Sequence, residues 1–138
     1  MTMLLDTCVL SELVKPNPDD KVIAFFNQLA HQQVFISSIT LAELHRGIAR
    51  LSPSKRQLEL TQWLEKIEEN YAANILDFER ATAKVWGQLT ALAQKQGKPL
   101  SFMDSMIAAT AIQHQISVVT RNIADFQYCN VPLINPWA

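Results

Sequence analysis

Residues 3–12, MLLDTCVLSE, decide the fold class of this chain. The three apolar residues Met3–Leu5 are too few for a helix and predict a short buried strand. Asp6 ends this strand, and the apolar residues of 9–14 predict a short helix that stops before Pro16, because proline disfavours the helical conformation in its predecessor. A buried strand that passes directly into a helix is typical of α/β proteins.

The same alternation of short apolar runs and helical patterns continues along the chain. Further strands are predicted at 34–36, 74–76, 116–119 and 131–134. Helices are predicted at about 20–29, 41–51, 60–71, 78–96 and 103–114, with Gly97 as the residue just after the fourth of these. Strands that alternate with helices predict one three-layer α/β/α domain over 1–138, with a central parallel sheet of four to five strands.

Length and charge fit a single domain without a strong electrostatic bias. The 138 residues include 12 basic and 13 acidic ones, and nucleic-acid-binding domains usually carry a basic excess instead. The cysteines at 8 and 129 lie far apart, which indicates reduced thiols and no disulfide framework. No apolar run is long enough for a membrane span, and the first residues lack the basic part of a signal peptide. We therefore expect a cytoplasmic protein without a membrane partner.

Acidic residues follow the predicted strands, where ligands bind in an open parallel sheet. Asp6 follows the first strand, and Glu43 lies one turn into the helix entered from the second. Asp104 begins the helix that leads into the fourth strand, and Asp125 follows that strand. If these carboxylates converge, their repulsion raises their pKa values unless a cation compensates. Ligation by oxygen alone favours Mg²⁺ or Mn²⁺, which are suited to phosphodiester chemistry.

Each of these acids also has a purely structural explanation. Thr40-x-x-Glu43 and Ser101-x-x-Asp104 fit the capping-box pattern, in which an acid satisfies a free backbone N–H at the start of a helix. Asp6 is a good N-cap residue. Residue chemistry alone leaves open whether the acids cap helices or bind a metal.

Four segments of the chain carry a resemblance to a known family. They are LDTCVLSE at 5–12, SITLAEL at 38–44 with Gly47, DSMIAATA at 104–111, and TRN at 120–122 with Asp125 and Phe126. In this order and at this spacing they resemble the PIN-domain ribonucleases, in particular the VapC-type toxins of bacterial toxin–antitoxin pairs, including the FitB-like branch. The resemblance extends to 134–137 and covers essentially the whole chain.

The resemblance implies a PIN-like fold and a divalent-metal-dependent endoribonuclease that hydrolyses RNA phosphodiester bonds. Carried over by position, Asp6 and Asp104 would be the principal ligands of Mg²⁺ or Mn²⁺. Glu43 would complete the acidic triad as a ligand, directly or through water. Asp125 matches a further catalytic acid that is present in part of the family.

Polar neighbours of these acids are expected to hydrogen-bond the carboxylates and fix their orientation. The residues expected in this role are Thr7, Ser38, Thr120 and Asn122. Asn122 stands where many relatives have Asp, so the number of metal ions stays open. Cys8 stands where Asn is common, and we expect it to be a small buried side chain.

The resemblance also implies protein partners. A cognate antitoxin would wrap the toxin with its C-terminal segment and block the acidic pocket. A homodimer is expected, within a possible larger toxin–antitoxin assembly, and the Leu, Ile and Trp residues of 41–71 suggest the helical pair there as its interface. With the four site acids set aside, nine acidic residues face 12 basic ones, which leaves a mildly basic surface for RNA.

Two other functions stay open at this point. A catalytically inactive PIN-like domain would serve as a scaffold for RNA or protein, although the intact Asp6, Glu43 and Asp104 argue against it. A Mg²⁺-dependent phosphatase of the haloacid-dehalogenase type also begins with a strand followed by Asp. That family requires a second Asp two residues later, where this chain has Cys8.

Overall fold

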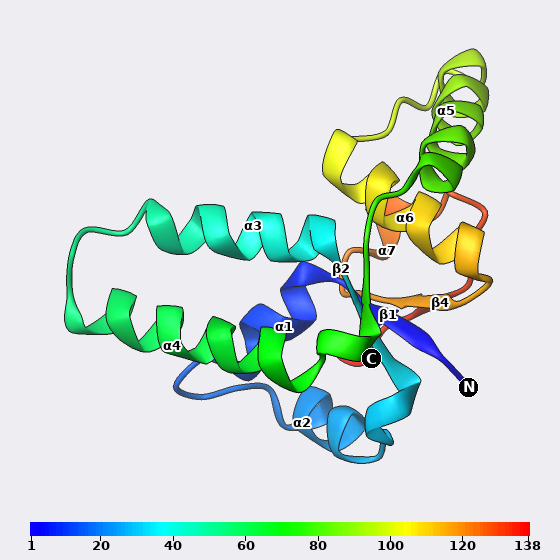
Figure 1. Cartoon of the computed structure of the whole chain (residues 1–138). Helices are drawn as coiled ribbons and strands as arrows, with labels where there is room; N and C mark the ends of the chain where they lie inside the picture. Colours follow the sequence, from blue (N-terminus) through cyan, green and yellow to red (C-terminus); the bar gives the residue numbers. More distant parts are fainter.

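Five short parallel strands form the central sheet of the computed structural model, which describes residues 1–138 (Figure 1). Their order is β3-β2-β1-β4-β5. The strands are β1 (Met3–Leu5), β2 (Val34–Ser37), β3 (Ile75–Leu76), β4 (Ser117–Val119) and β5 (Leu133–Ile134). The helices are α1 (Thr7–Leu13), α2 (Asp20–Asn27), α3 (Ser38–Ala49), α4 (Lys55–Asn70), α5 (Arg80–Lys95), α6 (Phe102–His114) and α7 (Ile123–Phe126). The predicted three-layer α/β/α architecture and its parallel sheet are confirmed.

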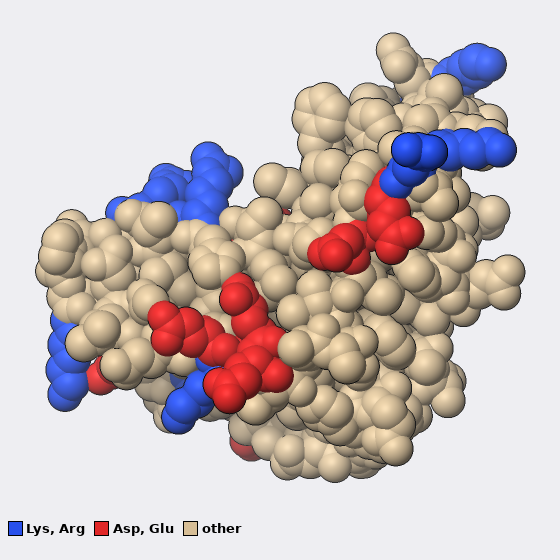
Figure 2. All heavy atoms as spheres, viewed as in Figure 1, with Lys and Arg blue, Asp and Glu red and all other residues tan.

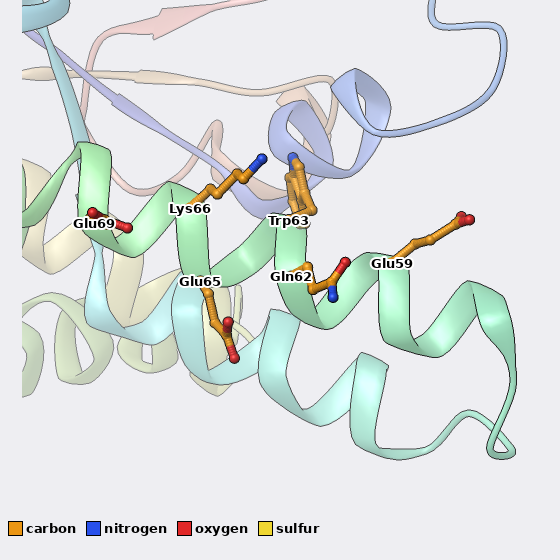
Figure 3. Close-up of a pocket in the computed structure, with 6 residues that line it drawn as sticks. All are labelled: Glu59, Gln62, Trp63, Glu65, Lys66 and Glu69. Atoms are coloured by element: carbon orange, nitrogen blue, oxygen red, sulfur yellow. The ribbon is translucent and has the colours of Figure 1, made fainter.

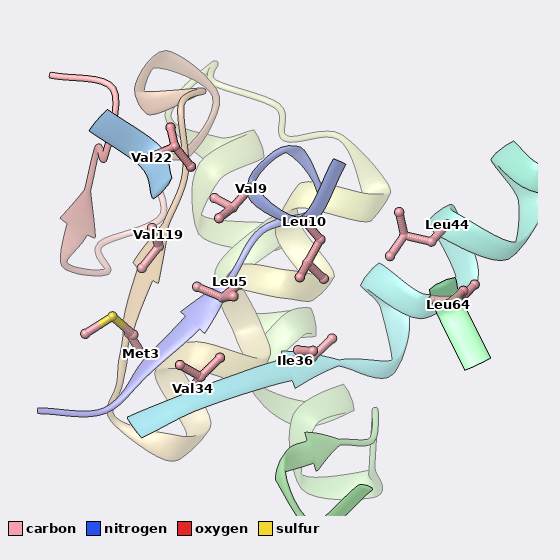
Figure 4. Close-up of a cluster of buried hydrophobic side chains, with 10 residues drawn as sticks. All are labelled: Met3, Leu5, Val9, Leu10, Val22, Val34, Ile36, Leu44, Leu64 and Val119. Atoms are coloured by element: carbon pink, nitrogen blue, oxygen red, sulfur yellow. The ribbon is translucent and has the colours of Figure 1, made fainter. Parts of the chain in front are cut away.

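Both faces of the sheet are covered by helices, which explains why β1 is apolar throughout. Met3 and Leu5 belong to the buried cluster on the face of α1, α2, α3 and α4 (Figure 4). Leu4 points to the opposite face, where it packs with residues of α6 and α7 such as Ile107 and Phe126. All five residues are at most 2% exposed. Strands buried on both faces show continuous apolar runs instead of alternation, as 3–5 does.

Two helices begin directly after their strands because the last polar residue of the strand end caps them. Asp6 caps α1, and its Oδ1 accepts the Thr7 N–H at 2.8 Å. Ser37 caps α3, and its hydroxyl accepts the Ile39 N–H at 3.0 Å. The prediction that the third helix begins near 41 is therefore wrong, since no loop separates it from β2.

The early start of α3 also overturns one structural explanation for the acids. Thr40 lies inside the first turn and is fully buried, and Glu43 lies a turn further on. The Thr40-x-x-Glu43 capping box is therefore wrong, and the Glu43 carboxylate is available for another role. Helix α4 also begins earlier than predicted, at Lys55 instead of about 60, because Ser54 caps it, and α7 was not predicted. The end of α5 agrees with expectation: Gly97 follows its cap residue with a φ of +70°, which glycine adopts without strain.

The helical pair α3–α4 extends from the sheet as an antiparallel arm (Figure 1). Its apolar side chains pack inward against the buried cluster, among them Leu44, Leu64 and Ile67. The outer surface is charged: Figure 2 shows basic side chains over α3 and a group of acidic side chains over α4. Several apolar residues of 41–71 are thus used within the protomer, whereas Leu51 and Leu58 remain exposed, and the dimer interface expected there stays a prediction.

No helix combines the length and the apolar character that crossing a membrane requires.

Candidate metal-binding active site

Asp6 lies at the carboxyl end of the central strand and is held by several donors. Its side chain is 3% exposed. Besides capping α1 through Oδ1, it accepts the Thr120 hydroxyl on Oδ2 at 2.8 Å and the Cys8 thiol at 3.5 Å. Thr120 comes from the end of β4, the strand that pairs with β1. The carboxylate is therefore fixed between two neighbouring strand ends, and it both caps a helix and belongs to the site.

Glu43 reaches the same edge of the sheet from the second turn of α3. Its Oε1 accepts the Thr7 hydroxyl at 2.7 Å. Burial raises the pKa of Glu43, the Thr7 hydrogen bond lowers it, and the negative charges of Asp6 and Asp104 raise it further. The influence of those two charges on Glu43 indicates that carboxylates 37 or more residues apart in the chain face one space.

Asp104 enters this space from the first turn of α6. The Ser101 hydroxyl caps the helix by accepting the Asp104 N–H at 3.2 Å, which is half of the predicted capping box. Burial raises the pKa of the Asp104 carboxyl, and the charges of Asp6 and Asp125 raise it as well. Asp125 lies in the exposed first turn of α7 and affects Asp104 but not Glu43. Asp104 and Asp125 line one pocket, which places Asp125 beside Asp104 at the outer end of the group. We call Asp6, Glu43, Asp104 and Asp125 the row of acids.

The atoms that the four acids offer suit a divalent metal ion. They are all carboxylate oxygens. Burial and, after it, mutual repulsion raise the pKa values of Glu43 and Asp104, and a bound cation relieves this repulsion. No three Asp, Glu, His or Cys side chains lie in an arrangement that would hold an ion directly. These residues fit an ion such as Mg²⁺, which keeps several waters and takes only one or two protein carboxylates.

The residues expected to support the carboxylates divide into two groups. Thr7 and Thr120 donate to Glu43 and Asp6, as described above. Thr120 also accepts the backbone N–H of Asn122 at 3.0 Å, but the Asn122 side chain is exposed and makes no capping bond. The Ser38 hydroxyl makes a different contact: it accepts the Phe78 N–H at 3.2 Å and so ties α3 to the segment after β3, and its expected role at the carboxylates stays a prediction.

Two further side chains of the first motif, Cys8 and Glu12, have hydrogen-bond partners that the sequence pattern did not predict. Cys8 is half-buried, and besides Asp6 its sulfur lies 3.6 Å from the Thr120 hydroxyl and accepts the Arg121 N–H at 3.5 Å. Glu12 is a buried acid of the first motif that stays outside the site. Its carboxylate binds Lys15 Nζ and the Asp19 N–H, both at 2.9 Å, and so anchors the loop between α1 and α2.

Hollows flank the row of acids on both sides. A groove of about 260 Å³ between α1, α3 and α4 ends at Glu43 and has Arg56 and Trp63 among its walls. A pocket of about 230 Å³ adjoins Asp104 and Asp125 at the other end and includes Lys98 and Tyr128. Sequence patterns did not point to Lys98 or Tyr128, because both lie in irregular segments without a motif.

A wider hollow of about 520 Å³ lies away from these acids, along the outer side of α4 (Figure 3). Its walls are charged or polar except for Trp63, and none of the four site acids lines it. This hollow is the outer surface of one helix, and it offers no convergent chemistry.

Known proteins are similar to this chain in sequence and in fold. Residues 3–127 match the PIN domain family. The chain is 38% identical to toxin FitB of Neisseria gonorrhoeae over 98% of both chains, and 35% identical to the VapC ribonuclease Y4jK of Sinorhizobium fredii over 98% of this chain and 97% of that one. The crystal structure of FitAcB from N. gonorrhoeae superposes with a TM-score of 0.93 over 99% of both chains, at 38% identity. The chain therefore belongs to the PIN-domain family.

Proposed function

We propose that this chain is the toxin of a type II toxin–antitoxin pair, and that residues 1–138 act as one PIN domain that cleaves RNA at the row of acids. The observation that carries the proposal is the convergence of Asp6, Glu43 and Asp104 from three separate elements on one edge of the sheet. Similarity to a protein named VapC ribonuclease and to one named toxin FitB supports the class of reaction and the biological role.

The acids would bind a divalent ion, Mg²⁺ or Mn²⁺, in the cytoplasm. Asp6 and Asp104 are the proposed ligands, with Glu43 binding directly or through water. The bound ion would polarise the phosphoryl oxygen and lower the pKa of the attacking water. Thr7 and Thr120 hold the Glu43 and Asp6 carboxylates in place by the hydrogen bonds described above. Asp125, at the outer end of the row, is the fourth acid proposed to act in catalysis.

A cleavage assay tests this assignment. Antitoxin-free protein is incubated with total RNA and Mg²⁺ or Mn²⁺, and the cut sites are mapped. We expect cleavage that EDTA abolishes and that the Asp6→Asn and Asp104→Asn variants lose. Glu65→Gln, an exposed acid on α4, is the matched control and should cut like wild type. Wild-type-like cutting by either site variant would refute the assignment, and metal binding without any cutting would favour an inactive scaffold.

We further propose that the groove beside Glu43 receives a segment of the cognate antitoxin. Half of its ten lining residues are apolar, among them Leu44, Ile48 and Trp63, and it leads directly to the acids. An apolar segment lying there would bring a following basic residue to Glu43. Co-expressed antitoxin should inhibit cleavage, and Trp63→Glu should release that inhibition. Sedimentation of the isolated toxin tests the expected homodimer.

A further inference from the structure

An exposed aromatic ring marks the start of α6, immediately beside the acids. Phe102 leaves 72% of its surface exposed, more than any other large apolar residue except Met1. It lines a hollow of about 390 Å³ together with Trp86, Pro99 and Leu100. The ring therefore borders a hollow with aromatic and apolar walls that Thr90 and Gln94 complete.

The position of this ring is fixed by its neighbours. The rings of Phe102 and Trp86 are stacked, with centroids 5.9 Å apart and planes at 19°. The Trp86 Nε1–H donates to the Ser105 hydroxyl at 2.9 Å, and that hydroxyl, which is fully buried, donates to the Phe102 carbonyl at 3.0 Å. One side of the Phe102 ring is thus backed by Trp86, and the remainder of the ring faces solvent in a defined orientation.

The same segment of chain borders both this surface and the acidic site. Phe102 lies two residues before Asp104 in the first turn of α6. Pro99 and Leu100 line the hollow of Phe102 and also the pocket of Asp104 and Asp125. Lys98 lines that acidic pocket as well, with its Nζ 4.1 Å from the centre of the Tyr128 ring. A cation and two of the acids therefore lie in one hollow and the open aromatic ring in a second, and Pro99 and Leu100 border both.

We propose that Phe102, backed by Trp86, is a stacking platform for an unpaired base of the RNA next to the phosphodiester at the acids. Single-stranded RNA is recognised by stacking of its bases on aromatic side chains and by cations along its backbone. Phe102 offers the aromatic face, and Lys98 offers the cation on the path towards Asp104 and Asp125. The inference rests on the proposed ribonuclease function, because the occupant is the substrate strand of that site.

Binding of a fluorescent RNA tests the platform without depending on cleavage. Short single-stranded RNAs carry 2-aminopurine at successive positions, and they are titrated with Asp6→Asn protein so that the RNA stays intact. We expect stacking to quench the fluorescence at one position. Adding Phe102→Ala should remove the quenching and weaken binding about 5- to 30-fold. Phe102→Trp should restore both, and Leu92→Ala, which removes an exposed apolar side chain of α5, should change neither.

An abasic RNA separates stacking from a general loss of affinity. RNA that lacks the base at the quenched position should bind the parent and the Phe102→Ala protein equally. An equal loss with intact and abasic RNA would overturn the proposal. It would also be overturned if Phe102→Ala split a dimer while RNA affinity per protomer stayed unchanged, because the ring would then belong to an interface between copies. Cutting of RNA by Asp6→Asn, visible on a gel, would instead contradict the proposed function.

Discussion

Replacing Thr120 by Val should damage both the stability and the metal affinity of the protein. Thr120 is fully buried, and its hydroxyl donates to Asp6 Oδ2 and accepts the Asn122 N–H. Val keeps the shape but removes both hydrogen bonds, one of them to a charged group. A hydrogen bond to a charged group contributes about 1.5–3 kcal/mol, so we expect a loss of about 2–3 kcal/mol. At roughly 3–5 °C per kcal/mol for a domain of this size, Tm should fall by about 6–15 °C.

The matched control is Thr110→Val, at another fully buried threonine. The Thr110 hydroxyl donates only to the Met106 carbonyl, one turn earlier in α6, and that carbonyl keeps its helical partner. Its removal should cost less than about 1 kcal/mol and leave the site untouched. Thr120→Ser should behave like wild type, because the donor remains.

Urea unfolding and metal titration together measure the effect of Thr120→Val. Loss of a group that orients a metal ligand typically weakens metal affinity about 10- to 100-fold, and we expect a shift in that range for the Mg²⁺ proposed to support cleavage. The reasoning fails if Thr120→Val and Thr110→Val lose the same stability and bind Mg²⁺ alike. Asp6 would then hold its orientation through the Thr7 N–H alone.

Three further predictions concern charge, metal and core. Burial and neighbouring carboxylates raise the pKa values of Asp104 and Glu43 above 3.8 and 4.5, so metal-free protein loses stability as pH rises through those raised values. Asp104→Asn should therefore raise Tm at neutral pH in EDTA, with no gain at or below pH 3.8. An unchanged Tm at neutral pH would contradict the repulsion between the carboxylates. Mg²⁺ at 100 times its Kd should stabilise wild type by about 2.7 kcal/mol, and a calorimetric shift of equal size in Asp104→Asn would exclude that carboxylate as a ligand. Leu64→Ala should lower the unfolding free energy by about 2–5 kcal/mol. Leu58→Ala, at an exposed position of the same helix, should change it by less than about 0.5 kcal/mol. Equal effects in chemical unfolding would show that Leu64 is not a core residue of the arm.

Sequence periodicity was sufficient for the layers and for the edge of the sheet at which the acids lie, but it left open whether they cap helices or bind a metal. The apolar run at 3–5 and the acid that follows it place Asp6 at the carboxyl end of a buried strand in any parallel arrangement. Asp104 and Asp125 flank the fourth strand, so pairing of that strand with the first brings them to the same edge. These placements depend on the direction of the strands, which the alternation of strands and helices predicts.

Local hydrogen bonding was harder to predict than the layers. Ser37 and Ser38 are adjacent polar residues, and the sequence does not say which of them caps α3. The choice of Ser37 moves the helix start, buries Thr40 and leaves the Ser38 hydroxyl to accept the Phe78 N–H. Lys98 reaches the site from a segment without periodicity, so only its three-dimensional position reveals it. Side-chain partners depend on tertiary contacts that a pattern of residue types does not encode.

The hydrogen bond between Thr120 and Asp6 joins residues 114 positions apart, and this distance bears on when the site forms during synthesis. β1, at the beginning of the chain, pairs with β4 near its end. Pairings between such distant segments form late in folding because a long loop must close first. An incomplete chain on the ribosome lacks the strand that secures Asp6, so we expect growing chains and C-terminally truncated products to be harmless to RNA. We therefore expect RNA-cleaving activity to appear only when translation of the chain is nearly complete.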